Sequence, residues 1–427
     1  MTFPIFQPLQ RISRSMSYNL QVLGRNPWGE ISGSLGDLGT LLPIMTALAT
    51  AHSIDFNSTL IFTGIFNILS GMFFGVPIPV QPMKAIASVA LSTKMGREET
   101  MGGGLSVGAV ILLLSITGLL ERASRLVPIP IVKGIQVGAG LSLILNAGAG
   151  INLISFPCGW EQLLWAILAT TLVFATSRNT RFPFALMIFV LGLAWGFPGT
   201  FPSLGLQKPS LSPPPSHSIY TGFLTAGAGQ LPLTILNSII AVNQLSQHLL
   251  PFRAAPSINS LGISVGLMNL IGCPYGSMPV CHGRSGGLAG QYRCGARSGS
   301  SIMFLGTLKL LVGLFVGDGL LRWLQSFPTG LLGTLIFLAG LELVSVGRTL
   351  NTTAPDLPHS GLNVDETSNL IPRGPLSEEI AEERWILMTI TAGALIMFKN
   401  DFVGFAAGYA YLGLLRLQEQ YLAYKAR

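Results

Sequence analysis

Two short segments of the chain combine proline, glycine and basic residues in a pattern that suits anion binding. They are residues 79–85 (PVQPMKA) and 279–287 (PVCHGRSGG). Proline fixes φ and removes a backbone N–H, so each segment should enter its following short helix from an extended conformation. The N-terminus of such a helix presents free N–H groups and about half a positive charge, which attracts an anion.

The basic and small residues of the two segments extend the same chemistry. Lys84 and Arg284 would each add a positive charge at a helix start, and with two helix N-termini they suit a dianion. Glycine lets backbone amides approach a ligand closely. The candidate substrate-binding residues here are Gln81, Met83, Lys84, Ala85, His282, Gly283, Arg284, Ser285, Gly286 and Gly287. Alternatively, the glycines only permit tight helix packing, and Lys84 reaches toward the membrane surface.

Three ionisable residues are candidates for proton coupling. Asp37 and Glu342 are carboxylates in apolar stretches, where charged groups are costly and often functional. The alternative for both is a structural hydrogen bond between helices. His282 is the third candidate, because imidazole titrates near neutral pH. Cys281 and His282 have no recognisable Asn or Asp partner for thiol catalysis, so the sequence does not predict an enzyme.

The composition shows where such a site would lie. Charged residues make up 10% of the 427 residues, against roughly 25% in soluble domains. The apolar residues make up 49%. These values exclude a soluble enzyme, a disordered protein and a nucleic-acid-binding protein. They predict an all-α polytopic protein of the lipid bilayer.

Apolar runs predict fourteen membrane segments in two sets of seven. The expected segments are 29–50, 58–75, 81–93, 103–122, 130–148, 160–177, 181–197, 228–250, 258–273, 283–295, 300–322, 328–347, 383–398 and 401–418. A bilayer-spanning helix needs about 20 residues, so the third segment of each set is too short and is predicted to be a half-helix.

Matches at a constant offset of 200 residues relate the two sets. Pro-Val at 79–80 recurs at 279–280, and Ala-Gly-Leu at 139–141 recurs at 339–341. Because seven is odd, the second set must enter the membrane from the opposite side. The pattern predicts an inverted repeat, in which paired broken segments mark the substrate site.

The repeat gives an expected domain organisation. The parts are a cytosolic N-terminus (1–28), a first repeat (29–197), a Pro- and Ser-rich linker (198–227), a second repeat (228–418) that contains a mobile loop (349–382), and a cytosolic C-terminus (419–427). Lys and Arg in the expected loops concentrate on the side of the N-terminus, which predicts that both termini are cytosolic.

The two broken segments resemble the signature stretches of eukaryotic molybdate transporters of the MOT type, which are relatives of the sulfate permeases (SulP family). Residues 288–293 (LAGQYR), 36–40 (GDLGT) and 230–234 (QLPLT) are also similar to that family. The resemblance implies a seven-plus-seven inverted repeat with a core domain that carries the site and a gate domain beside it. It also implies molybdate as the transported substrate.

In this family fold the eighth segment lines the site, which adds two candidates. Asn237 and Gln244 lie on that segment seven residues apart, so they should share one helix face. Members of the molybdate branch lack the cytosolic STAS domain of most sulfate permeases, and no such domain is expected after residue 418.

The sequence therefore predicts a secondary molybdate transporter that holds the anion between two half-helix N-termini. The alternatives are a transporter of sulfate or another oxyanion, and an anion channel. No cofactor, metal site or nucleic-acid partner is expected. A plasma-membrane location is favoured over a vacuolar or other internal membrane, and a homodimer is left open.

Overall fold

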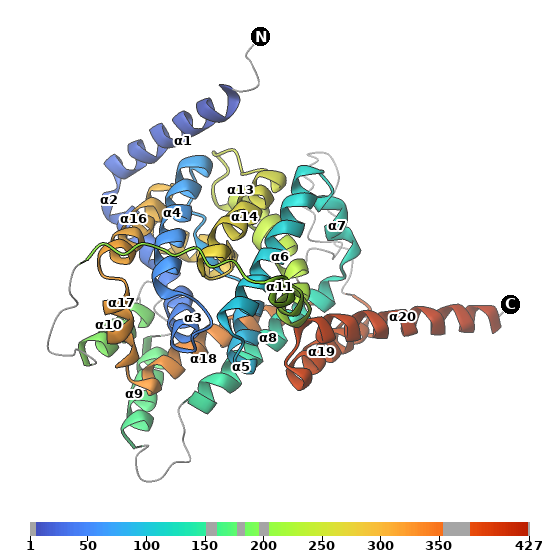
Figure 1. Cartoon of the computed structure of the whole chain (residues 1–427). Coiled ribbons are helices and arrows are strands. Elements are labelled where there is room, and N and C mark those ends of the chain that lie inside the picture. The colour runs from blue at the N-terminus through green and yellow to red at the C-terminus, as the bar shows by residue number, and fades with distance from the viewer. Residues whose placement is uncertain (1–5, 151–159, 177–183, 196–204, 353–375, 426–427) are drawn as a thin grey trace.

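The computed structural model describes residues 6–150, 160–176, 184–195, 205–352 and 376–425, most of them in helices (Figure 1). The first half contains α1 (Phe6–Arg25), α2 (Pro27–Ser34), η1 (Leu35–Asp37), α3 (Leu38–Thr50), α4 (Phe56–Phe74), β1 (Val80–Pro82), α5 (Lys84–Thr93), α6 (Arg97–Ile116), α7 (Leu120–Leu126), α8 (Ile129–Gly150), α9 (Trp160–Thr176) and α10 (Phe184–Trp195). The second half contains α11 (Ser216–Gly222), η2 (Phe223–Gly227), α12 (Ala228–Leu233), η3 (Thr234–Ile240), α13 (Ala241–Leu249), α14 (Ile258–Gly272), η4 (Cys273–Tyr275), β2 (Val280–His282), η5 (Arg284–Ala289), α15 (Gly290–Arg293), α16 (Ser300–Phe315), α17 (Asp318–Gln325), α18 (Thr329–Ser345), η6 (Val346–Thr349), α19 (Glu378–Phe398) and α20 (Asp401–Lys425).

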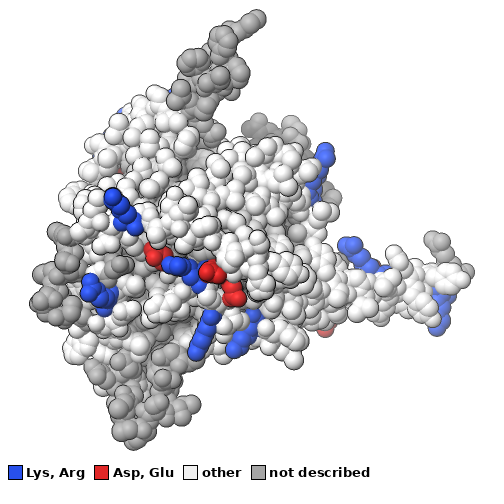
Figure 2. Space-filling model, in the orientation of Figure 1, with Lys and Arg blue, Asp and Glu red and all other residues white. Residues whose placement is uncertain are grey.

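Several helices are long and apolar enough to cross a membrane. Among the described residues they are α4, α6, most of α8 and the helical stretches Ser216–Leu249 and Thr329–Thr349. On the face shown in Figure 2, charged side chains are sparse and most of the described surface is uncharged. The predicted all-α membrane architecture is therefore confirmed, whereas the count of fourteen segments stays a prediction.

The two broken segments meet in the only sheet of the described residues. β1 and β2 pair antiparallel, with three residues of each strand in register. Two backbone bonds extend the pairing symmetrically: the Met83 N–H donates to the Pro279 carbonyl at 2.9 Å, and the Gly283 N–H donates to the Pro79 carbonyl at 3.0 Å. Met83 is equivalent to Gly283, and Pro79 to Pro279, at the offset of 200 residues. The two hydrogen bonds are therefore related by an approximate two-fold axis between the strands.

Two asparagines on the preceding helices support the strands in the same symmetric way. Oδ1 of Asn67 on α4 accepts the Val80 N–H at 2.8 Å, and Oδ1 of Asn269 on α14 accepts the Val280 N–H at 2.9 Å. Buried backbone donors need such partners, because an unpaired N–H is costly away from water. The structure thus shows the predicted inverted repeat at the level of single hydrogen bonds.

Helix packing follows the same symmetry. α4 packs against α16, and its counterpart α14 packs against α6, while α8 and α18 pack against each other. At the α8–α18 contact, a Cβ on Gly140 would lie 2.7 Å from the Gly340 carbonyl oxygen, and the reverse distance is also 2.7 Å. Only glycine allows these two helix backbones to approach so closely.

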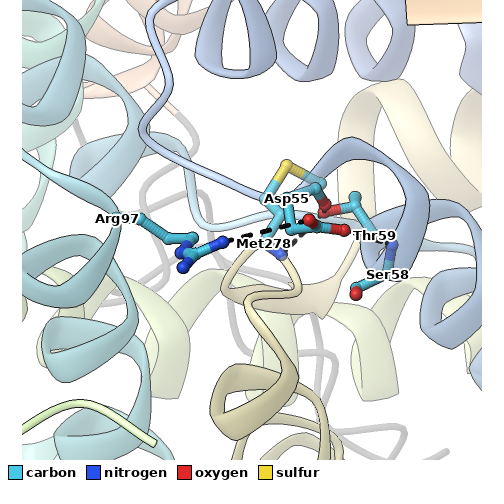
Figure 3. Close-up of polar contacts among 5 residues, drawn as sticks. All are labelled: Asp55, Ser58, Thr59, Arg97 and Met278. Carbon is cyan, nitrogen blue, oxygen red and sulfur yellow. Dashed lines mark hydrogen bonds and ion pairs between the residues drawn. The ribbon is translucent and has the colours of Figure 1, made fainter. Parts of the chain in front are cut away.

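The start of α4 anchors the chain that leads into β2 (Figure 3). Oδ1 of Asp55 accepts the Ser58 N–H at 2.7 Å and so caps α4, and Oδ2 of Asp55 lies 4.0 Å from Nη1 of Arg97. Oγ1 of Thr59 accepts the Met278 N–H at 3.0 Å. The first repeat therefore holds the entrance to the second broken segment.

A buried carboxylate joins α2 to the start of α16. The side chain of Glu30, 1% exposed, accepts the N–H groups of Arg297 at 2.7 Å, Ser298 at 3.1 Å and Ser301 at 3.0 Å. These amides precede and begin α16, where a helix has unpaired donors and a partial positive charge. Glu30 thereby caps α16 from another segment of the chain.

Two expected boundaries differ from the structure. The predicted linker 198–227 is too long, because helix α11 begins at Ser216 and runs through η2 into α12. Its first residues are polar, so the apolar pattern misses them. Of the expected loop 349–382, residues 353–375 lie outside the described residues, and α19 already begins at Glu378.

Candidate functional site

A cavity of about 100 Å³ lies where the two broken segments meet. It is bounded by β1 and α5, by β2 and η5, and by α8, α12, η3, α18 and η6. A water molecule needs roughly 10–15 Å³ of such space, so a small inorganic anion fits. The lining residues are Gln81, Pro82, Lys84, Ala85, Gln136, Ala139, Gln230, Leu233, Asn237, Ser238, Cys281, His282, Gly283, Arg284, Glu342, Leu343 and Val346.

The structure brings eight of the fourteen candidate residues into this lining. They come from both repeats and are Gln81, Lys84, Ala85, Asn237, His282, Gly283, Arg284 and Glu342. Of the other candidates, Met83, Gln244 and Gly287 lie outside this lining. The cavity is where the sequence predicts the site, between the starts of two short helices.

The first half-helix starts abruptly because Pro82 ends β1. Met83 keeps an extended backbone as the N-cap, and Lys84 is the first residue of α5. The Ala85 N–H donates to Oε1 of Gln230 at 3.0 Å, and Nε2 of Gln230 donates to Oγ1 of Thr234 at 3.0 Å. A side chain of α12 therefore holds one of the amides expected to be free for an anion.

Lys84 forms an ion pair across the cavity. Its Nζ lies 3.8 Å from Oε1 of Glu342 on α18, and the two side chains are 17% and 28% exposed. The sequence predicts both residues as candidates but does not pair them. The positive charge expected for the anion is thus opposed by a carboxylate from the other repeat.

The second half-helix starts with a wider turn. η5 is a π-helix, in which the Leu288 N–H donates to the Gly283 carbonyl at 3.0 Å. A Cβ on Gly283 would lie 2.4 Å from Cδ of Gln81, and a Cβ on Gly287 would lie 3.1 Å from Cγ of Pro79. These glycines let η5 pack on β1, and Gly287 is absent from the described cavity lining.

Three further residues of η5 complete the predicted set in this segment. Arg284 lines the cavity and is exposed. Ser285 and Gly286 follow it in η5, but their placement relative to the cavity lies outside what the structure describes. The expectation that they present donors to the anion stays a prediction.

Two cavity residues carry buried polar atoms without a partner in the described part of the chain. They are Nδ2 of Asn237 and Nδ1 of His282. The other ring nitrogen of His282 lies 3.1 Å from Oγ of Ser264, and the ring meets Phe74 edge-on. Unpaired buried polar atoms are costly, and each of these two keeps an unused hydrogen-bonding capacity among the described residues.

Besides Gly287, the candidates Gln244 and Met83 lie outside the cavity lining. Gln244 on α13 is exposed, because Asn237 lies within the π-helix η3, whose wider turns break the seven-residue face relation. Met83 is 1% exposed and packs in the apolar core. Asp37 ends η1, and its side chain lies outside the described part of the structure.

The sequence analysis did not identify two glutamines that line the cavity. Gln136 lies on α8 and Gln230 on α12, with exposed fractions of 8% and 3%. Both are amides in apolar helices, and Gln230 matches Glu30 at the repeat offset. This correspondence could have identified Gln230 from the sequence, because Glu30 also caps a helix of another segment.

Comparisons with known proteins identify relatives of this chain. A family model described as "Molybdate transporter of MFS superfamily" matches residues 29–143 and 222–343. The Arabidopsis thaliana proteins molybdate transporter 2 and molybdate transporter 1 are 39% and 36% identical over 377 and 381 residues, covering 77% of this chain and 81% of each relative. Molybdate transporter 1 of Chlamydomonas reinhardtii is 31% identical over 438 residues, covering 75% of this chain and 84% of the relative.

Solved structures show the same fold. The transmembrane domain of the cyanobacterial bicarbonate transporter BicA matches with a TM-score of 0.60 at 14% identity, over 89% of this chain and 97% of that chain. The murine anion transporter Slc26a9 in the inward-facing state matches with a TM-score of 0.62 at 14% identity, over 92% and 68%. The fold is thus of the sulfate-permease type, as predicted. With the family match and the curated relatives, which are transporters and not enzymes, the chain is an integral membrane protein that belongs to the molybdate transporter family.

Proposed function

We propose that the protein is a secondary transporter of molybdate, which it binds in the cavity between β1–α5 and β2–η5. The observation that carries the proposal is the cavity itself. It combines Lys84 and Arg284 at the starts of two broken helices with a buried amide nitrogen of Asn237 that has no partner among the described residues. A tetrahedral dianion needs such convergent donors and positive charge.

Alternating access follows from the inverted repeat. Two packings of the same elements, related by the approximate two-fold axis, would open the cavity first to one side of the membrane and then to the other. In this proposal the broken segments with α4, α6, α14 and α16 form the core domain, and α8 and α18 belong to the gate domain.

Import of a dianion needs an energy source. Against a potential of about 100 mV, a charge of −2 requires roughly 4.6 kcal/mol, which scarce external anion cannot supply. Molybdate is therefore accompanied by protons or exchanged for another anion, with Asp37, Glu342 and His282 as candidate proton carriers. Both termini lie in the cytosol, and the membrane is the plasma membrane.

Uptake of labelled molybdate into proteoliposomes tests the proposal. We expect saturable uptake that tungstate, of similar size and charge, inhibits more strongly than sulfate does. Stronger inhibition by sulfate would favour the alternative of a sulfate transporter, and flux that grows without saturation would favour a channel.

The coupling is tested with a pH gradient, inside alkaline, at clamped voltage. Proton coupling predicts faster molybdate uptake with the gradient and a smaller response in Asp37→Asn or Glu342→Gln. Uptake that ignores the gradient in the wild type and in both variants would leave exchange as the mechanism.

A further inference from the structure

The Lys84–Glu342 ion pair connects two units of the molecule, the broken segments and the α8–α18 pair, which also contact each other where α5 packs against α8. Lys84 begins α5, which follows the β1–β2 sheet, whereas Glu342 lies on α18, which packs against α8. The 3.8 Å contact between Nζ and Oε1 therefore links the broken segments to the α8–α18 pair. A movement of one unit against the other would separate these two atoms.

The pair also occupies the place where an anion would bind. Of the described cavity-lining residues, Glu342 is the only acidic one, and Lys84 and Arg284 are the basic ones. A carboxylate oxygen and an oxyanion oxygen compete for the same ammonium group, because both accept charge-assisted hydrogen bonds from it. The Glu342 carboxylate thus takes the place at Lys84 that a bound oxyanion would take.

Space exists for the carboxylate once it leaves Lys84. Glu342 also lines a second cavity, of about 670 Å³, together with Arg348, Asn351 and Trp385. The residue therefore lies at the boundary between the two cavities. A rotated Glu342 side chain would enter a space that contains a guanidinium and an amide as partners.

We propose that the Lys84–Glu342 pair holds the empty transporter in place, and that the transported anion releases it by replacing the Glu342 carboxylate at Lys84. This inference rests on the proposed function and adds to it which molecular event permits movement. The empty protein keeps the two units joined by opposite charges. The loaded protein has Lys84 satisfied by the anion, so α5 can move relative to α18.

Two fluxes distinguish the empty from the loaded transporter. Net uptake into vesicles without molybdate requires the empty protein to return, whereas uptake into vesicles preloaded with unlabelled molybdate requires only loaded movements. The proposal predicts that exchange exceeds net uptake in the wild type. In Glu342→Gln this ratio should fall roughly two- to fivefold, the range expected for a partly exposed ion pair, and molybdate should bind more tightly by a similar factor.

Glu121→Gln is the matched control, because it breaks the exposed Glu121–Arg125 pair at 3.5 Å without touching the cavity. Its flux ratio and molybdate affinity should equal those of the wild type. Glu342→Ala provides a second variant without the carboxylate if the glutamine variant misfolds. General damage would lower binding and both fluxes together, which differs from the predicted rise in affinity.

The outcomes separate the two proposals. A folded wild type that binds no molybdate in a binding titration would overturn the proposed function and this inference with it. A wild type that binds and transports molybdate, while both Glu342 variants keep its flux ratio and affinity, would overturn only the role of the ion pair.

Discussion

The two broken segments have strands that are supported in the same way, but they differ in the helix that follows the strand and in side-chain chemistry. In both, an asparagine of the preceding helix binds the first residue of the strand, and reciprocal backbone bonds join the strand ends. Lys84 and Arg284 stand 200 residues apart at equivalent positions. Lys84 is largely buried and paired with Glu342, whereas Arg284 is exposed and begins a π-helix.

This difference separates what the repeat determines from what single residues add. The symmetric bonds aim two helix N-termini at one cavity, which is enough to attract an anion. The residues that differ between the segments decide how the positive charge is used. Lys84 is paired with the Glu342 carboxylate, whereas Arg284 is exposed. A transporter needs both properties, since the anion must bind and its binding must change the contacts between moving parts.

Loss of the paired cation should produce the largest effect. Lys84→Ala is expected to weaken molybdate binding at least tenfold, equivalent to about 1.4 kcal/mol, because a charge in a partly dehydrated cavity is weakly screened. Arg284→Ala should have a smaller effect, since its exposed charge is better screened. Binding titrations of purified protein measure both, with Lys94→Ala at the other end of α5 as the control. Equal affinities for wild type and Lys84→Ala would refute the role of Lys84.

The glycine contact between the segments should be next in size. In Gly283→Ala the new Cβ would lie 2.4 Å from Cδ of Gln81, so the buried Gln81 side chain must shift in the cavity wall. We expect a loss of roughly 1–3 kcal/mol of stability, as for overpacked cores, together with weaker molybdate binding. Gly393→Ala on α19 is the control, because nothing lies within 4 Å of its added Cβ. Thermal unfolding in detergent that is equal for both variants would argue against this tight contact.

The amide cap of α5 offers a smaller perturbation. Gln230→Glu would place a carboxylate at the Ala85 N–H, as Glu30 does at the start of α16. We expect molybdate affinity to fall roughly two- to fivefold by like-charge repulsion, with little change in stability because acids favour helix N-termini. Gln247→Glu, exposed on α13, is the control. Unchanged affinity in Gln230→Glu would place the anion away from α5.

The features that were predicted correctly are local in the sequence. Proline positions and apolar lengths indicate the two broken segments, and matches at one offset indicate the repeat. The errors arise where tertiary structure changes a local rule. Gln244 does not lie on the predicted face, because η3 is a π-helix. The partners of Lys84 and Ala85 come from α18 and α12, and no spacing in the sequence connects these helices to α5.

The asparagine supports provide the finest test of the symmetry. Asn67→Ala and Asn269→Ala each leave a buried valine N–H without its acceptor, which should cost about 1–3 kcal/mol of stability. The two losses should not be equal. Nδ2 of Asn269 also donates to the Val280 carbonyl at 2.7 Å and to the Val265 carbonyl at 2.8 Å, whereas Nδ2 of Asn67 has no partner among the described residues. Asn269→Ala should therefore be the more destabilising by about 2 kcal/mol, because it loses two more hydrogen bonds that usually contribute about 1 kcal/mol each. Chemical denaturation in detergent compares the two variants directly. A larger loss in Asn67→Ala would mean that the first segment, which carries the paired lysine, depends more on its support than the hydrogen bonds indicate.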